Sequence, residues 1–458
     1  MKFKISLTAL LLLGYLASNG QNIYRTACQG NMARLDSLLG RTEINTQDNR
    51  GRSLLHWAVA CNQEEVFQQL IKKGITFNLE DDDGTTPLYM AVRFQRMEFF
   101  NTLKDLEKDS TWKRKYGALL FEKAILNKDP IFVEKLIKAG VPINLKNKRG
   151  STPLEIALRT NTTEIVALLK ANGADESMVR TIVLKGTYMG QKPPEKVAKV
   201  FAPNVISTEE SEFGSVFNKA GTEFYYGVDV NGKNEIRYAE LRNNQWTTPK
   251  TILSHEQYGY NDPFLSPDEN RLYFISNQAL DGKGESKDID IWYANRTASG
   301  WSEPINAGTN INTAGEEYYI SFTNQGTMYF STDAYTDENS RNHDVYYSTF
   351  VNGKFQKAVR LGDAINTDAY EADVFVAPDE DYLIFCATRY DGLGRGDLYI
   401  SFKNDDGSWS QAVNMGDKVN TEYHELCPFV TEDGKYLFYT SKQDIYWVST
   451  AVFKDLKD

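Results

Sequence analysis

A spacing of 33 residues recurs through the first part of this chain and constrains its fold more than any other feature. Four glycines are separated by this spacing, and each is followed seven residues later by an alanine: Gly51, Gly84, Gly117 and Gly150. A second series keeps the same register, with Glu107 in its remaining slot: Gly74, Gly140 and Gly173. The segments between them have helical periodicity, and a glycine just past a helix end suits a left-handed cap. A fixed period of this length predicts a stacked solenoid of helical units.

The segments GRSLLHWA from Gly51, GTTPLYMA from Gly84 and GSTPLEIA from Gly150 resemble the ankyrin repeat. The third unit, GALLFEKA from Gly117, lacks the Thr-Pro pair, and a degenerate copy from Ile23 is expected to form the N-terminal cap. The resemblance implies an all-α solenoid over residues 21–180, with four units after the cap and surfaces that bind other proteins.

A second repeat, of about 54 residues, follows a predicted linker at residues 181–196 and extends over residues 197–452. Large aromatic residues recur in register, and the short segments around them alternate between apolar and polar residues: Trp246, Trp301, Phe355 and Trp409. Four short strands in each unit predict an all-β propeller. The last unit lacks its fourth strand, which residues 197–208 match, so we expect a ring of five blades closed by this N-terminal strand. Six blades are the alternative.

The repeated turns and aromatic strands of this second region resemble the WD40-like propeller repeat of TolB-type bacterial envelope proteins. In that family a Pro-Asp-Gly turn precedes an aromatic strand. Here only Asp433-Gly434 keeps the glycine, and Asp268 and Asp379 are each followed by a glutamate.

Seven acidic residues are the candidate binding face, because propeller connectivity places them near the long loops on one face of the ring: Glu212, Glu317, Glu371, Glu425, Asp290, Asp344 and Asp397. Such a face predicts a site for a glycan, a cation or a basic partner. In the structural alternative, each Glu accepts hydrogen bonds from the neighbouring Asn-Thr loop, because every copy carries the same motif. The sequence does not tell which metal, if any, would bind.

Four cysteines are too few for a disulfide-built scaffold. Cys28 and Cys61 occupy near-equivalent positions in adjacent helical units, and we expect both to be small core residues rather than a bridge. Cys386 and Cys427 lie on predicted strands of adjacent blades and are expected to be buried thiols.

Residues 1–20 combine two lysines, an apolar run and a stretch of small residues, which predicts a signal peptide and a periplasmic or extracellular location. The apolar run is shorter than the roughly 20 residues a permanent membrane helix needs, and no later segment is apolar enough to span a bilayer.

Composition and motifs favour a binding protein over an enzyme. The net charge of −11 argues against a nucleic-acid binder, and no catalytic or cofactor-binding motif is present. We therefore predict an exported, non-enzymatic protein without a cofactor, which binds protein partners at the bacterial cell envelope through both regions. The alternatives are a propeller that binds glycans or the cell wall, and a carboxylate-based propeller hydrolase.

Overall fold

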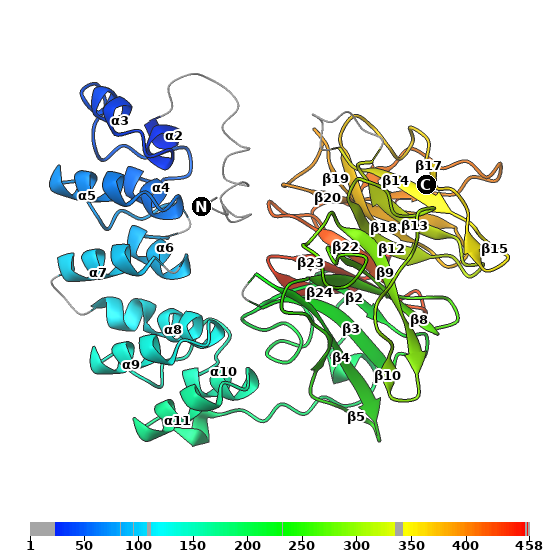
Figure 1. Cartoon of the computed structure of the whole chain (residues 1–458), viewed down its shortest axis with the longest axis horizontal. Helices are drawn as coiled ribbons and strands as arrows, with labels where there is room; N and C mark the ends of the chain where they lie inside the picture. Colours follow the sequence, from blue (N-terminus) through cyan, green and yellow to red (C-terminus); the bar gives the residue numbers. More distant parts are fainter. Residues whose placement is uncertain are drawn as a thin grey trace. The chain divides into compact units, whose positions relative to one another are not determined.

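The computed structural model describes residues 23–82, 84–94, 96–107, 111–230, 232–334, 342–453 and 456. The chain divides into two compact units, Met1–Arg180 and Thr181–Asp458, and each is described by itself (Figure 1). The predicted signal peptide, residues 1–20, lies outside the described residues. Among the residues described, no helix has the length and apolar character needed to cross a membrane.

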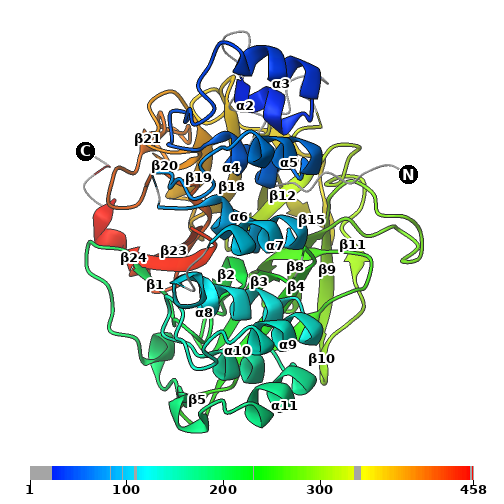
Figure 2. The same cartoon turned by 90° about the vertical axis from the view of Figure 1, so that its left-hand side faces the viewer.

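The first unit is a stack of antiparallel helix pairs (Figures 1 and 2). The pairs are α2 (Ile23–Cys28) with α3 (Met32–Leu39), α4 (Leu54–Ala60) with α5 (Glu64–Lys72), α6 (Pro87–Arg93) with α7 (Met97–Leu106), α8 (Thr111–Leu126) with α9 (Pro130–Lys138), and α10 (Pro153–Arg159) with α11 (Thr163–Ala171). A continuous apolar core runs through the stack. This arrangement confirms the predicted all-α solenoid.

Asx-type turns begin the regular units. The side chains of Asp48, Asp81 and Asn147, which are 33 residues apart or multiples of 33, accept hydrogen bonds from backbone N–H groups two or four residues later. In two units a threonine then caps a helix that opens with proline, and Thr152 Oγ1 accepts a bond from Glu155 N at 3.3 Å. The local sequence therefore specifies both the turn and the helix start.

The third unit replaces this turn by helix. Arg114 stands where the other units have Asp or Asn, so the turn-forming carbonyl side chain is missing, and α8 already begins at Thr111. Gly117 lies inside this helix, whereas Gly84 at the equivalent position has a φ of 70°. A Cβ atom on Gly117 would lie 2.6 Å from Val141 Cγ1, so glycine here permits close packing instead of a turn.

The expectation that Cys28 and Cys61 are separate core residues is wrong. They form a disulfide bond with a Cα–Cα distance of 5.1 Å. Stacking of α2 against α4 brings equivalent positions of neighbouring units within the range that a disulfide spans. Cys386 and Cys427 are free and buried, as expected.

The second unit contains five antiparallel blades, each with its own sheet. The blades are β2 (Ser211–Phe217), β3 (Glu223–Asp229), β4 (Asn234–Arg242) and β6 (Lys250–Leu253); β7 (Tyr260–Leu265), β8 (Arg271–Ser276), β9 (Asp290–Thr297) and β11 (Ile305–Asn306); β12 (Glu317–Phe322), β13 (Met328–Thr332), β14 (Asp344–Ser348) and β17 (Val359–Arg360); β18 (Tyr370–Val376), β19 (Tyr382–Thr388), β20 (Asp397–Phe402) and β21 (Val413–Asn414); and β22 (Leu426–Val430), β23 (Tyr436–Ser441), β24 (Asp444–Ser449) and β1 (Lys199–Val200). Short additional strands extend hairpins: β5 (Gln245–Trp246), β10 (Gly300–Trp301), β15 (Phe350–Val351) and β16 (Lys354–Phe355).

An N-terminal strand completes the last blade. In β1, Lys199 pairs with Trp447 and Val200 with Tyr446 of β24. The next residue, Phe201, is fully buried and contacts Phe438 and Trp447 at ring-centroid distances of 4.9 and 5.3 Å. The predicted five-blade arrangement is confirmed, and β1 supplies the fourth strand of the last blade. The TolB-type classification stays a prediction.

Part of the segment predicted as a linker, residues 181–196, contacts the propeller. Trp246 donates hydrogen bonds from its backbone N–H to Leu184 O and from its indole Nε1 to Gly186 O. Ser449 N donates to Glu195 O. These hydrogen bonds hold the segment against the first and last blades. The segment also packs on apolar side chains of the propeller core, where Met189 is buried.

Candidate functional site

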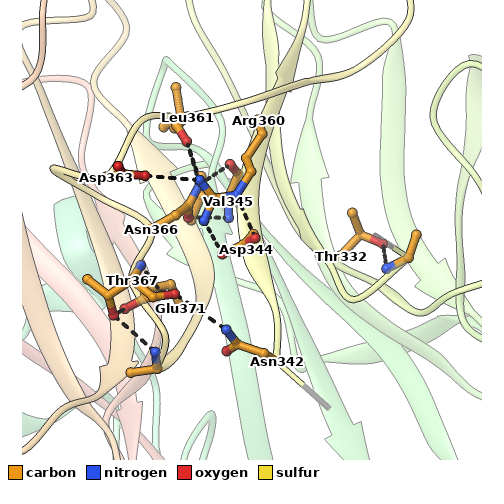
Figure 3. A network of polar contacts seen from close by, with 12 residues as sticks. Thr332, Asn342, Asp344, Val345, Arg360, Leu361, Asp363, Asn366, Thr367 and Glu371 are labelled. Atoms are coloured by element: carbon orange, nitrogen blue, oxygen red, sulfur yellow. Dashed lines mark hydrogen bonds and ion pairs between the residues drawn. The ribbon is translucent and has the colours of Figure 1, made fainter. Parts of the chain in front are cut away.

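The four repeated glutamates are fully buried. Each accepts hydrogen bonds from the backbone N–H and the hydroxyl of a threonine four residues earlier: Thr208 for Glu212, Thr313 for Glu317, Thr367 for Glu371 and Thr421 for Glu425. Figure 3 shows this contact for Thr367 and Glu371, whose hydroxyl-to-carboxylate distance is 2.6 Å. In these four blades the contact fixes the loop that enters the innermost strand.

Burial is the largest influence on the pKa values of Glu212, Glu317 and Glu371. It raises the pKa of Glu212 well above its ordinary value and that of Glu317 to about 7, although threonine hydrogen bonds act in the opposite direction. Burial also raises the pKa of Glu371, while Thr367 and Arg389 lower it. Arg389 Nη2 lies 3.0 Å from Glu371 Oε1.

The three predicted aspartates are also buried, and each contacts the fourth strand of its own blade. Asp290 accepts a bond from Asn306 Nδ2 and lies 2.6 Å from Lys287 Nζ. The other two bind fourth-strand side chains at 2.7 and 2.8 Å: Asp344 contacts Arg360 Nε and Asp397 contacts Asn414 Nδ2. Figure 3 shows the Asp344–Arg360 pair beside the loop that contains Asn366.

The structure thus distributes the seven predicted acidic residues over the blades as buried, hydrogen-bonded groups. It does not bring them together on an open surface. The contacts correspond to the structural alternative, and the binding face stays a prediction.

A different set of residues meets at the centre of the ring, and the sequence analysis did not identify it. Each innermost strand has a β-bulge at the same position, where pairing with the second strand shifts register. The bulge residues all have φ between 46° and 53°: Gly214, Asp262, Tyr319, Asp373 and Cys427. Four of the five carry side chains in a backbone conformation that favours glycine, a strain that is typical of functional positions.

Three of these side chains form a compact polar cluster, which we call the channel cluster: Asp262, Asp373 and Cys427. One carboxylate oxygen from each aspartate and the thiol sulfur lie within 4.8 Å of one another. Cys427 Sγ is 3.5 Å from Asp262 Oδ1, and the backbone N–H of Cys427 donates to Asp373. The exposed fractions are 5% for Asp262, 9% for Asp373 and 2% for Cys427.

The channel cluster has an unfavourable concentration of buried acidic groups. Burial and the charge of Asp373 raise the pKa of Asp262, and burial raises the pKa of Asp373. Burial also raises the pKa of the Cys427 thiol well above its ordinary value. Such a cluster either retains protons or binds a cation.

Aromatic side chains pack along the axis beside the cluster. Phe264, Phe375 and Phe429 each lie two residues beyond a bulge residue, and Phe429 contacts Phe264 and Phe375 at 6.1 and 5.9 Å between ring centroids. The cluster therefore has an apolar boundary on this side.

A sequence signal for the bulge position exists in retrospect. The bulge residue lies two residues after the repeated glutamate in four blades and two residues after Tyr260 in the blade of β7. There the Tyr260 hydroxyl donates a hydrogen bond to Gln278 Oε1. The residue differs between blades, whereas the motif around it repeats. A position whose residue changes from blade to blade therefore leaves no repeated residue in the sequence.

The helical unit has its own candidate surface, which is positively charged. Residues 111–150 contain ten basic and three acidic side chains. Arg114, Lys128 and Lys148 are exposed in this segment. A pocket of about 490 Å³ lies beside α8 and is lined in part by Phe77, Trp112 and Lys115. The N-terminal part of α8, which replaces the turn of the third unit, lines this pocket together with residues of the preceding unit.

Comparison with known proteins identifies the helical unit. Residues 23–113 match a family model described as ankyrin repeats (3 copies), and residues 106–157 match one described as ankyrin repeats (many copies). The first unit is therefore an ankyrin-repeat region, which indicates protein–protein interaction.

The relatives in the comparison resemble only part of the chain. Potassium channel AKT2/3 from Arabidopsis thaliana is 28% identical over 42% of this chain and 22% of its own length. A putative ankyrin repeat protein, L371, from Acanthamoeba polyphaga mimivirus is 25% identical over 30% of this chain and 19% of its own. Neurogenic locus notch homolog protein 1 from Homo sapiens is 36% identical over 25% of this chain and 4% of its own. The chain thus spans less than a quarter of the length of each of these relatives.

Proposed function

We propose that this protein is an exported, non-enzymatic interaction protein of the bacterial cell envelope, and that its ankyrin region binds an acidic protein surface. The observation that carries the proposal is the excess of basic side chains in residues 111–150, next to an aromatic-lined pocket. Complementary charge steers association and selects among partners. Aromatic side chains provide the apolar contact that binding energy requires.

Two features support export. The leader-like sequence at residues 1–20 is typical of a signal peptide. The Cys28–Cys61 disulfide is independent of it and is typical of proteins that fold outside the reducing cytosol. Mass spectrometry after alkylation without reductant tests this part: the bond is expected in protein from the envelope fraction. Free thiols at Cys28 and Cys61 in that fraction would contradict it.

Binding through the ankyrin region is tested by charge reversal. The variant Arg114→Glu, Lys128→Glu, Lys148→Glu is expected to lose most partner protein from envelope extracts in a quantitative pull-down. The matched control, Lys72→Glu, Lys73→Glu, Lys170→Glu, changes the charge equally at exposed positions near the C-terminal ends of α5 and α11 and is expected to retain it. Equal retention by both variants would contradict the assigned surface.

A glycan-binding propeller is the second candidate, and one observation favours it. Tyr390, in the loop between β19 and β20, is fully exposed, and the exposed fraction of nearby Leu393 is 53%. Exposed rings offer flat apolar faces on which sugars can stack. Co-sedimentation with purified cell-wall polysaccharide tests this function, and Tyr390→Ala is expected to abolish the retention if the propeller binds glycans.

A further inference from the structure

We propose that the channel cluster binds one divalent transition-metal ion of the Zn²⁺ class, with the Asp262 and Asp373 carboxylates and the Cys427 thiolate as its ligands. This site lies in the propeller and does not depend on partner binding by the ankyrin region.

Geometry is the first argument. Asp262, Asp373 and Cys427 come from three different blades, on β7, β18 and β22, yet their donor atoms lie within 4.8 Å of one another. Ligand atoms around a tetrahedral zinc ion lie about 3–4 Å apart, as bond lengths of about 2.0–2.3 Å require. Small side-chain rotations therefore bring all three donors to one ion, and a water molecule can complete the tetrahedron.

The bonding of Asp262 is an independent second argument. Its side chain is 95% buried and points into the cluster. Within the described parts of the chain, the Cys427 thiol at 3.5 Å is the single hydrogen-bond donor to this carboxylate. A thiol is a weak donor, whereas buried carboxylates in native proteins have strong partners. A cation supplies the partner that this carboxylate lacks.

The blade pattern is the third argument. Residues that build every blade recur in register, but the bulge position holds aspartate in two blades and glycine, tyrosine and cysteine in one blade each. At Gly214 a Cβ atom would lie 2.6 Å from Asp262 Oδ1, so glycine in that blade leaves room for the carboxylate. Tyr319 in the remaining blade donates to Pro428 O at 2.8 Å, next to Cys427. The five positions together form one asymmetric site.

The donor set indicates the class of metal. Thiolate favours Zn²⁺ and similar ions over Ca²⁺ and Mg²⁺, which prefer oxygen ligands alone. Two carboxylates and a thiolate carry three negative charges, and a dication neutralises two of them. Metal binding also releases the thiol proton, which opposes the effect of burial on Cys427.

Titration of the chelator-treated full chain with Co²⁺ tests the proposal, because thiolate ligation gives Co²⁺ a charge-transfer absorption band. We expect one equivalent to bind with this band. Cys427→Ser is expected to abolish the band, and Asp262→Asn and Asp373→Asn to weaken binding by at least about tenfold. Zn²⁺ is expected to displace Co²⁺ and to raise the Tm of the wild-type chain but not of Cys427→Ser.

Cys386→Ser is the matched control, since Cys386 is the other free buried thiol and lies 3.2 Å from His424 Nε2. This variant is expected to keep the band. Absence of the band in the wild-type chain at excess Co²⁺, or its persistence in Cys427→Ser, would overturn the proposal. Binding without the band would also overturn it, because the other group of potential metal ligands among the described residues, Glu316, Asp333 and His343, offers Co²⁺ no thiolate. Near-UV circular dichroism establishes that each variant is folded before titration.

Discussion

The ankyrin region and the propeller both consist of repeated units, but they respond differently when one copy departs from the pattern. In the solenoid a unit packs against its neighbours only, so the loss of the turn at Arg114 changes one helix and leaves the stack intact. In the propeller all five innermost strands meet at one axis. A departure at the bulge position therefore faces the other four copies, as Asp262, Asp373 and Cys427 do. A changed residue in one repeat therefore has a local effect in the solenoid, whereas in the propeller it lies next to the equivalent residues of the other blades.

The two regions also differ in how they hold carboxyl groups. Among the described residues, the carboxyl groups whose pKa is raised mainly by burial all lie in the propeller: Glu212, Asp262, Asp290, Glu317, Glu371 and Asp373. In the solenoid, burial opposes the ionised form of Asp48, but hydrogen bonds from Arg52 and Arg50 outweigh it and lower the pKa. The propeller thus contains buried carboxyl groups in its interior, whereas in the solenoid carboxylates such as Asp48 accept hydrogen bonds at the turns.

The largest expected effect comes from opening the ring. Phe201→Ala removes a fully buried ring that joins β1 to the last blade, and it is expected to destabilise the propeller by about 3–5 kcal/mol. The loss of propeller stability is measured by urea unfolding, in which hydrogen exchange of individual peptides reports on each region separately. Ankyrin peptides are expected to keep their protection, and an equal loss in both regions would show that the two units unfold together.

Removing the disulfide is the corresponding change in the solenoid. Cys28→Ser with Cys61→Ser is expected to destabilise the ankyrin region by about 2–4 kcal/mol, because the bond closes a loop between residues 33 apart. The same unfolding experiment measures it. Loss of protection is expected in the peptides of α2 to α5 first, and unchanged stability there would contradict a bond that restrains the end of the stack.

A pH series sharpens the contrast between the regions. The pKa of Glu317 is about 7 in the folded chain against an ordinary value of 4.5, so the folded state binds its proton more tightly. The stability that this group contributes is fully present below pH 4.5 and is lost as the pH rises through 7, by about 3 kcal/mol.

Glu317→Gln is expected to flatten this pH dependence of propeller unfolding, and Glu256→Gln, at an exposed position, to leave it unchanged. Asp48 behaves in the opposite way: its contribution to the solenoid is present above its ordinary pKa of 3.8 and is lost as the pH falls below it. A pH dependence in Glu317→Gln that equals that of the wild-type chain would contradict the assignment for Glu317.

The smallest expected effect is at a helix cap in the solenoid. Thr152→Ala removes the acceptor for Glu155 N and is expected to cost about 1 kcal/mol. Exchange in peptides of α10 and α11 measures it, with the exposed Thr163→Ala as a control of the same chemistry. A loss that extends to the propeller would contradict the neighbour-only cooperativity of the stack.

Much of the fold was predictable because repeated units leave periodic signals in a sequence. The 33-residue spacing of Gly51 and Gly84 and the 54-residue spacing of Glu317 and Glu371 predicted both architectures, and the missing fourth strand predicted the ring closure. The disulfide was not predictable in the same way, since the spacing of Cys28 and Cys61 places them in adjacent units but does not give the distance between them.

The sequence by itself therefore determined the units, their number and their order, because turn residues, helix caps and alternating strands act over short distances. Only the tertiary structure decided which side chains meet. It buried the repeated glutamates against threonines and brought together Asp262, Asp373 and Cys427, which are up to 165 residues apart. The physical reason is ring closure: a bulge at the same place in each blade directs residues of different types toward one axis, and the repeat motif marks this position without recording which residues meet there.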